Sequence, residues 1–239
     1  MPPSRATGPR LLVVRPPEGT VPAEGTVLPE GTVPGAGGGR AAYPVVAFGH
    51  GFLQRPWRYR GLMTALAGHG FLVVAPDTQA GPLPRHRALA DDLWRAVEWA
   101  RANEPHAHPD LAAAVGHSMG AGCALLGATR WPGFRAVATL AALDTRPSML
   151  PALGSLQVPS LFVVGTADTV VPPARTRAVY AATAGSPAWL EIPGGGHCGV
   201  LDSAFPRGVA CGGQELDPTR QLVTSALSVG TWLAEMLRN

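Results

Sequence analysis

From Tyr43 to the C-terminus, short apolar runs alternate with segments whose apolar residues recur at helical spacing. The runs end at Gly, Pro or polar residues, whereas a segment such as Arg85–Asn103 carries an apolar stripe that includes Leu89, Leu93 and Val97. Alternating strands and helices produce a mostly parallel sheet with helices on both faces. The pattern therefore predicts an α/β fold, and ligands in such folds bind where the strands end.

The apolar runs and stripes locate the expected elements. We expect strands at Leu11–Val14, Val45–Phe48, Phe71–Ala75, Leu111–Val115, Ala136–Leu143, Ser160–Val164 and Trp189–Ile192. We expect helices at Tyr59–His69, Arg85–Asn103, directly after Ser118, at Pro172–Ala184 and from Pro218 onward. Residues 1–42 would hold the first strand and a Pro/Gly-rich loop, in which Glu-Gly-Thr-Val begins at Glu18, Glu24 and Glu30, and residues 43–239 the catalytic domain, as a single domain overall.

The segment Gly116-His117-Ser118-Met119-Gly120 joins one expected strand to a helix that is rich in small residues. Glycines on either side of a serine let strand and helix approach closely, so that the hydroxyl projects out of the sheet. The motif is weak evidence alone, because a Gly-rich chain produces it by chance. A catalytic interpretation needs a base, an acid and an oxyanion loop at other strand ends.

Three further strand ends carry suitable residues: Gly49-His50-Gly51-Phe52, then Asp168, then His197. The order Ser, Asp, His along the chain resembles that of the α/β-hydrolase superfamily, from about Tyr43 to the C-terminus. The Gly-Gly-Gly-His-Cys-Gly segment and the short connections are most similar to lidless members, which include chlorophyllase-like, dienelactone-hydrolase-like and bacterial cutinase-like proteins. The resemblance implies an α/β-hydrolase fold without a large lid.

The resemblance also implies a role for each residue. Ser118 would be the nucleophile, His197 the general base, and Asp168 the group that orients the imidazole. The backbone amides of Phe52 and Met119 would form the oxyanion hole.

Other residues could fill two of these roles. His50 fits better as a support for the oxyanion loop, and His117 is expected to pack or hydrogen-bond locally inside the turn. Asp144 ends the strand before the one that bears Asp168, and some superfamily members carry their acid there. Asp168 is favoured because a helix begins cleanly after it, although a turn or capping role would also explain it.

Several further carboxylates and apolar side chains have weaker expectations. Asp77 would organise a loop, and the pair Asp91-Asp92 would lie on a solvated helix face. The residues expected to line an apolar substrate pocket beside the oxyanion loop are Leu53, Trp57 and Val171. Because only Thr145–Pro159 is available for a lid, we expect an open cleft, which favours hydrolysis over acyl transfer.

The three cysteines differ in their expected roles. Cys198 and Cys211 could form a disulfide that staples the loop beside His197, although two free thiols are the alternative if the chain has no leader. Cys123 would be a small buried apolar residue. A zinc site at these residues lacks a fourth ligand at a usual spacing, so we expect neither a metal nor a cofactor.

Composition excludes several functional classes. The net charge is +3 and every basic side chain except His is Arg, which is too little charge to predict nucleic-acid binding. No apolar run approaches the roughly 18 residues of a membrane helix. The N-terminus lacks a signal pattern, which favours a cytoplasmic protein, or a secreted or organellar one whose leader has been removed. The oligomeric state stays open.

We therefore expect a serine ester hydrolase that acts on small-molecule or polymeric esters through an acyl-enzyme. Chlorophyllase-like and cutinase- or polyesterase-like activities are both compatible with the chain. A thioesterase or serine peptidase would use the same residues, and a non-catalytic binding protein on this scaffold is the alternative from another class.

Overall fold

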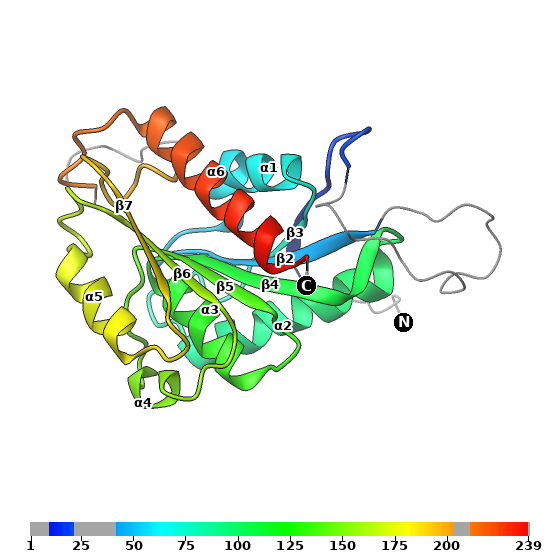
Figure 1. Cartoon of the computed structure of the whole chain (residues 1–239), viewed down its shortest axis with the longest axis horizontal. Coiled ribbons are helices and arrows are strands. Elements are labelled where there is room, and N and C mark those ends of the chain that lie inside the picture. The colour runs from blue at the N-terminus through cyan, green and yellow to red at the C-terminus, as the bar shows by residue number, and fades with distance from the viewer. Residues whose placement is uncertain (1–9, 22–41, 203–210, 239) are drawn as a thin grey trace, which may run out of the picture.

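The computed structural model describes residues 10–21, 42–202 and 211–238, and its strands form one seven-stranded sheet (Figure 1). The strands are β1 (Leu11–Val14), β2 (Tyr43–Gly49), β3 (Leu72–Pro76), β4 (Ala107–His117), β5 (Ala136–Leu140), β6 (Ser160–Gly165) and β7 (Ala188–Ile192). The helices are α1 (Arg60–Gly68), α2 (His86–Asn103), α3 (Met119–Arg130), α4 (Leu150–Leu153), α5 (Pro173–Ala182) and α6 (Pro218–Met236), with a 3-10 helix η1 at Pro56–Tyr59. Every predicted strand and helix is present; β1 has the predicted bounds, and most of the other elements have shifted ends.

The strand order is β1-β3-β2-β4-β5-β6-β7, and only β1 pairs antiparallel with its neighbour. The chain crosses from β2 outward to β3, then returns to β4 on the other side of β2 and continues outward to β7. A crevice forms at the carboxyl ends of two strands between which the winding reverses in this way. Here the two strands are β2 and β4, so the loop after Gly49 lies beside Ser118.

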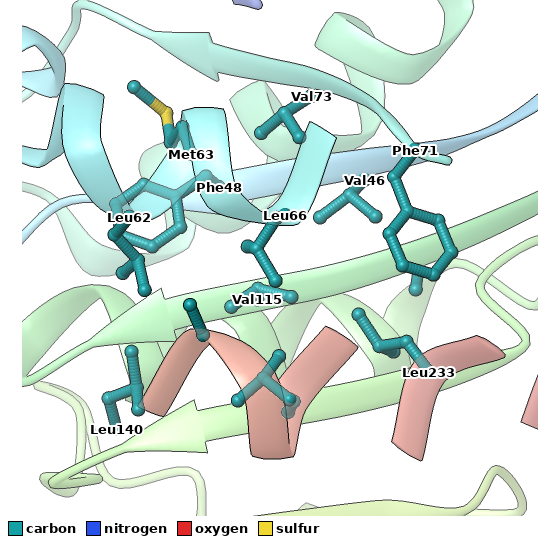
Figure 2. Packing of buried hydrophobic residues seen from close by; sticks show 14 of the residues in the cluster. Val46, Phe48, Leu62, Met63, Leu66, Phe71, Val73, Val115, Leu140 and Leu233 are labelled. Atoms are coloured by element: carbon teal, nitrogen blue, oxygen red, sulfur yellow. The ribbon is translucent and has the colours of Figure 1, made fainter. Parts of the chain in front are cut away.

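Helices cover both faces of the sheet, with α1 and α6 on one face and α2 and α3 on the other (Figure 1). In β2, Val46 and Phe48 join the first apolar cluster, whereas Val45 and Ala47 join the second. Successive strand residues point to opposite faces, so a strand covered on both faces must be apolar throughout. Figure 2 shows the first cluster, in which α1 and Leu233 of α6 lie against the strands. The predicted, mostly parallel α/β fold is confirmed.

One strand is shorter than predicted. The strand expected over Ala136–Leu143 ends at Leu140, because Ala141 has a left-handed φ of 53° that takes the chain out of the sheet. The connection over 141–159 holds only the four-residue helix α4. The described residues therefore contain no large lid, as predicted.

The prediction that Asp91 and Asp92 lie on a solvated face is wrong. Arg130 and the indole of Trp131 donate hydrogen bonds to Asp91, and the Thr78 hydroxyl donates to Asp92. The spacing within α2 could not show this, because the partners come from α3 and from the loop after β3. In the Pro/Gly-rich stretch, the copies that begin at Glu24 and Glu30 lie outside the described residues.

Candidate active site

Ser118 occupies the sharp turn between β4 and α3. Its φ of 55° and ψ of −119° are values that residues other than Gly rarely adopt, and such strain concentrates at functional sites. The amide of Ser118 donates to the carbonyl of Leu140 at 2.8 Å, and its carbonyl accepts from the amide of Ala121 at 3.0 Å. These bonds hold the turn between the sheet and the helix, so the strained conformation is fixed on both sides.

Glycine is required where the turn packs against the neighbouring strand. A Cβ at Gly116 would collide with the carbonyl oxygen of Gly120, and a Cβ at Gly120 would collide with the carbonyl oxygens of Gly49 and His50. These obstacles are backbone atoms of α3, of the end of β2 and of His50, so no side-chain rotation could relieve the collisions. The two glycines of the motif are therefore explained by packing.

We expect Gly120→Ala to lower the free energy of unfolding by about 3 kcal/mol, because the backbone of β2 or α3 must shift to admit the methyl group. Urea denaturation measures this change. Gly68→Ala is the matched control, since a Cβ at Gly68, the last residue of α1, meets nothing within 4 Å. Equal losses in the two variants would contradict the packing explanation.

Ser118, His197 and Asp168 form a continuous hydrogen-bonded line. His197 Nε2 lies 3.1 Å from Ser118 Oγ, and His197 Nδ1 lies 2.7 Å from Asp168 Oδ2. An ionised carboxylate only accepts, so Nδ1 carries the ring proton and Nε2 is left to accept one. All three residues are between 4% and 8% exposed. This arrangement can take the proton from a serine hydroxyl as the hydroxyl attacks a carbonyl carbon.

Of the two candidate acids, Asp168 is the one that contacts His197. Its Oδ1 accepts hydrogen bonds from the amides of Val170 and Val171, at 2.9 and 2.8 Å, which leaves Oδ2 for the imidazole. Asp144 Oδ1 instead accepts from two amides of its own loop, at 2.8 and 3.0 Å. Asp144 therefore closes the turn after β5.

Both ring nitrogens of His50 lie within hydrogen-bond distance of backbone carbonyl oxygens. Its Nδ1 lies 2.9 Å from the carbonyl oxygen of Gly51 and its Nε2 lies 2.7 Å from that of Thr78. The residue is fully buried, and it ties the loop after β2 to the loop after β3. These contacts suit a support for the oxyanion loop.

Asp77, which directly follows β3, also binds the loop after β2. Arg55 Nη1 donates to both of its carboxylate oxygens at 3.0 Å, and the Arg55 guanidinium lies 5.2 Å from the ring centroid of Trp57. The carboxylate is thus paired across two loops, which accords with the loop-organising role expected for it.

Two buried residues near His197 were not identified from the sequence. The Tyr59 hydroxyl lies 2.9 Å from His117 Nδ1, and the side-chain amide of Gln221 hydrogen-bonds both the amide and the carbonyl of Gly196. Tyr59 comes from η1 and Gln221 from α6, far from His197 along the chain. Neither belongs to a motif, so no signal in the sequence marks them.

The residues expected at the oxyanion hole and pocket lie at the same end of the sheet. Phe52 and Trp57 are 48% and 50% exposed, and Leu53 is similarly exposed. Met119 is the first residue of α3, where the amide has no acceptor within the helix. Val171 is buried and contacts the site through its amide, so a pocket role for its side chain stays a prediction.

A disulfide joins Cys198 to Cys211 in the structure, with the two Cα atoms 5.3 Å apart. Cys198 directly follows His197, so the bond ties the base-bearing loop to the segment that leads into α6. Cys123 is free and buried, and burial raises the pKa of its thiol to about 12.

We expect the Cys198–Cys211 bond to be present in the isolated protein. Alkylation of the denatured, unreduced chain should modify one thiol, that of Cys123, and alkylation after reduction should modify all three. Three modified thiols without reduction would contradict the bond. The double variant Cys198→Ser/Cys211→Ser should lose about 3 kcal/mol of unfolding free energy, because the unfolded chain regains a loop.

Two further properties follow from the described residues, 10–21, 42–202 and 211–238. Among them, no group of three or more His, Cys, Asp or Glu side chains is arranged to hold a metal ion. No helix in this part of the chain has the length and apolarity that crossing a membrane would require.

Comparison with known proteins relates this chain to a protein family and to a plant protein. Residues 14–204 match a protein family described as "PETase: PET hydrolase-like", and this range includes Ser118, Asp168 and His197. A stretch of 85 residues is 33% identical to Chlorophyllase-1 of Arabidopsis thaliana. That stretch is 33% of this chain and 26% of the plant protein, so the match spans about a quarter of that relative's length.

Proposed function

Because this chain belongs to the PET hydrolase-like family, a family of hydrolases within the α/β-hydrolase superfamily, we propose that it is a serine ester hydrolase with Ser118, His197 and Asp168 as its triad. The observation that carries the proposal is the hydrogen-bonded line from Ser118 Oγ through His197 to Asp168, with distances of 3.1 and 2.7 Å.

The reaction begins when Ser118 Oγ attacks the ester carbonyl carbon while its proton passes to His197 Nε2. Asp168 stabilises the imidazolium that forms and holds its orientation. Collapse of the tetrahedral intermediate breaks the bond to the alcohol oxygen, which takes the proton from His197 Nε2. The acyl-enzyme is then hydrolysed by a water molecule, whose proton passes to His197 and finally back to Ser118.

The negative charge of the tetrahedral intermediate needs hydrogen-bond donors. The amide of Met119, at the N-terminus of α3, and the amide of Phe52, in the loop after β2, are the proposed donors. The reversal of strand order between β2 and β4 supports this pairing, because it brings the two loops together. The helix dipole of α3 adds a favourable potential at the same point.

The proposed substrates are bulky apolar carboxylic esters in an open cleft. Phe52, Leu53 and Trp57 are exposed apolar residues of the segment that follows β2, and the connection over 141–159 holds no large lid. One relative is named for chlorophyll and the family for a polyester, so both small-molecule and polymeric esters are proposed.

A substrate panel with an active-site probe tests this function. The purified protein should hydrolyse p-nitrophenyl butyrate and should be labelled at Ser118 by a fluorophosphonate. A chlorophyll ester and an aromatic polyester film then rank the substrate classes, with a thioester and a peptide as comparisons. Absence of both turnover and labelling would refute the enzyme and favour a binding protein, whereas faster turnover of the thioester or peptide would reassign the substrate.

A further inference from the structure

A chain of hydrogen bonds runs beneath the candidate active site, from the oxyanion loop to the loop that carries the base. The amide of Gly51 donates to the Tyr59 hydroxyl at 3.0 Å, and that hydroxyl lies 2.9 Å from His117 Nδ1. His117 Nε2 lies 3.0 Å from the carbonyl oxygen of His197. Gly51 directly precedes Phe52, so the chain joins the proposed oxyanion donor to the proposed base.

The partners determine where each proton lies. A carbonyl oxygen only accepts, so His117 Nε2 carries the ring proton and donates it to His197. Nδ1 is then an acceptor for the Tyr59 hydroxyl, whose oxygen accepts from Gly51. Burial lowers the pKa of His117 well below its ordinary value and raises that of Tyr59, so both groups stay uncharged near neutral pH. Every donor in this series of three hydrogen bonds therefore has one acceptor.

The rings that make these bonds are firmly packed. Tyr59 is completely buried, with its ring centroid 4.9 Å from that of Phe48 and 5.6 Å from that of His117. The rings of His117 and His197 are 4.6 Å apart. Gln221 Oε1 accepts a hydrogen bond from the amide of Gly196 at 2.9 Å, and Gln221 Nε2 donates to the carbonyl oxygen of Gly196 at 2.7 Å. The base-bearing loop is therefore held through both peptide groups of Gly196.

We propose that Tyr59 and His117 are positioning residues, which together set the oxyanion loop and the base-bearing loop relative to each other. This inference rests on the proposed function for its effect on turnover, but the coupling between the two loops is a property of the structure alone. Without the Tyr59 hydroxyl, the buried Gly51 amide loses its acceptor and His117 Nδ1 loses its donor. The bond to the carbonyl oxygen of His197 is then no longer connected to the oxyanion loop, so the two loops can shift relative to each other.

Tyr59→Phe is the sharpest test, because it keeps the ring packing and removes only the hydroxyl. We expect kcat for p-nitrophenyl butyrate to fall about tenfold and KM to change by less than about twofold, since misplaced catalytic groups reduce the chemical step. Thr176→Val is the matched control: it removes a fully buried hydroxyl, which donates to the carbonyl of Ala142, and should leave kcat unchanged.

Two substitutions at His117 distinguish the hydrogen bond with Tyr59 from the hydrogen bond with His197. In His117→Gln, the longer amide can still donate toward the carbonyl of His197. In His117→Asn, the shorter side chain can only replace the acceptor for Tyr59. We expect both variants to lose kcat, and His117→Asn to lose more than His117→Gln, because the bond that it removes directly holds the loop that carries His197. The reverse order would contradict the proposal.

Hydrogen exchange tests the coupling without reference to activity. In Tyr59→Phe, amides in both 50–54 and 194–200 should exchange about tenfold faster, because the hydroxyl is hydrogen-bonded to Gly51 directly and is linked to the second segment through His117. Unchanged exchange in 194–200, or equal acceleration in Thr176→Val, would overturn the proposal. If the wild-type protein has no esterase activity, the proposed function fails while this measurement still decides the inference.

Discussion

Ser118→Ala and His197→Ala should each reduce kcat by about a millionfold, to the residual rate that binding and the oxyanion donors alone support. Both atoms of the 3.1 Å contact between Ser118 Oγ and His197 Nε2 are needed in the same step. The serine supplies the nucleophile and the histidine removes its proton, so loss of either stops acyl-enzyme formation. The double variant should therefore be no slower than the slower single variant.

Steady-state kinetics on p-nitrophenyl butyrate measure these losses, and thermal unfolding shows whether each variant is folded. Ser160→Ala is a suitable control, because it removes another buried serine hydroxyl, at the amino end of β6, for which no hydrogen-bond partner is found in the described residues. Its kcat should equal that of the wild type. If Ser118→Ala retained more than about one part in a thousand of the wild-type kcat, Ser118 would not be the nucleophile.

Asp168→Asn should reduce kcat by about ten-thousandfold with little effect on KM. The asparagine side chain can present its NH₂ group to His197 Nδ1, which favours the tautomer with the proton on Nε2, and that tautomer cannot accept from Ser118. The carboxylate charge that stabilises the imidazolium is also lost. The two amides that hold Asp168 Oδ1 would still position the new side chain, so the fold should persist.

Asp144→Asn is the matched control, because Asp144 is the other acid that the chain places at a neighbouring strand end. Its Oδ1 accepts from two amides of its own loop, so the substitution should affect stability slightly and leave kcat near the wild-type value. A large loss of kcat in Asp144→Asn together with an active Asp168→Asn would reverse the assignment of the acid.

Local sequence patterns were sufficient for the elements and for the chain order of the candidate triad. The strands could be predicted because a strand buried on both faces must be apolar at every position, as in Val45–Phe48. Ser118, Asp168 and His197 could be proposed because each lies in the turn that follows such a run. The alternation of apolar runs and helical stripes also predicted that these runs pair as parallel strands.

Predictions that depended on partners far along the chain were less successful. Asp91 and Asp92 were expected on a solvated face because their spacing on α2 is compatible with one, but Arg130 and Thr78 come from other elements. The end of β5 was misplaced because the left-handed turn at Ala141 has no Gly, Asn or Asp to mark it.

Three features could be derived from the sequence: the α/β class, the strand-turn-helix at Ser118 and the residue types available at the strand ends. These depend on properties of neighbouring residues: apolar periodicity, glycine spacing and side-chain chemistry. Two further features required the folded arrangement. Asp168 rather than Asp144 contacts His197, and Tyr59, His117 and Gln221 hold the base-bearing loop. Such contacts join segments far apart in the chain, and their distances follow from sheet order and helix packing, which no local pattern encodes.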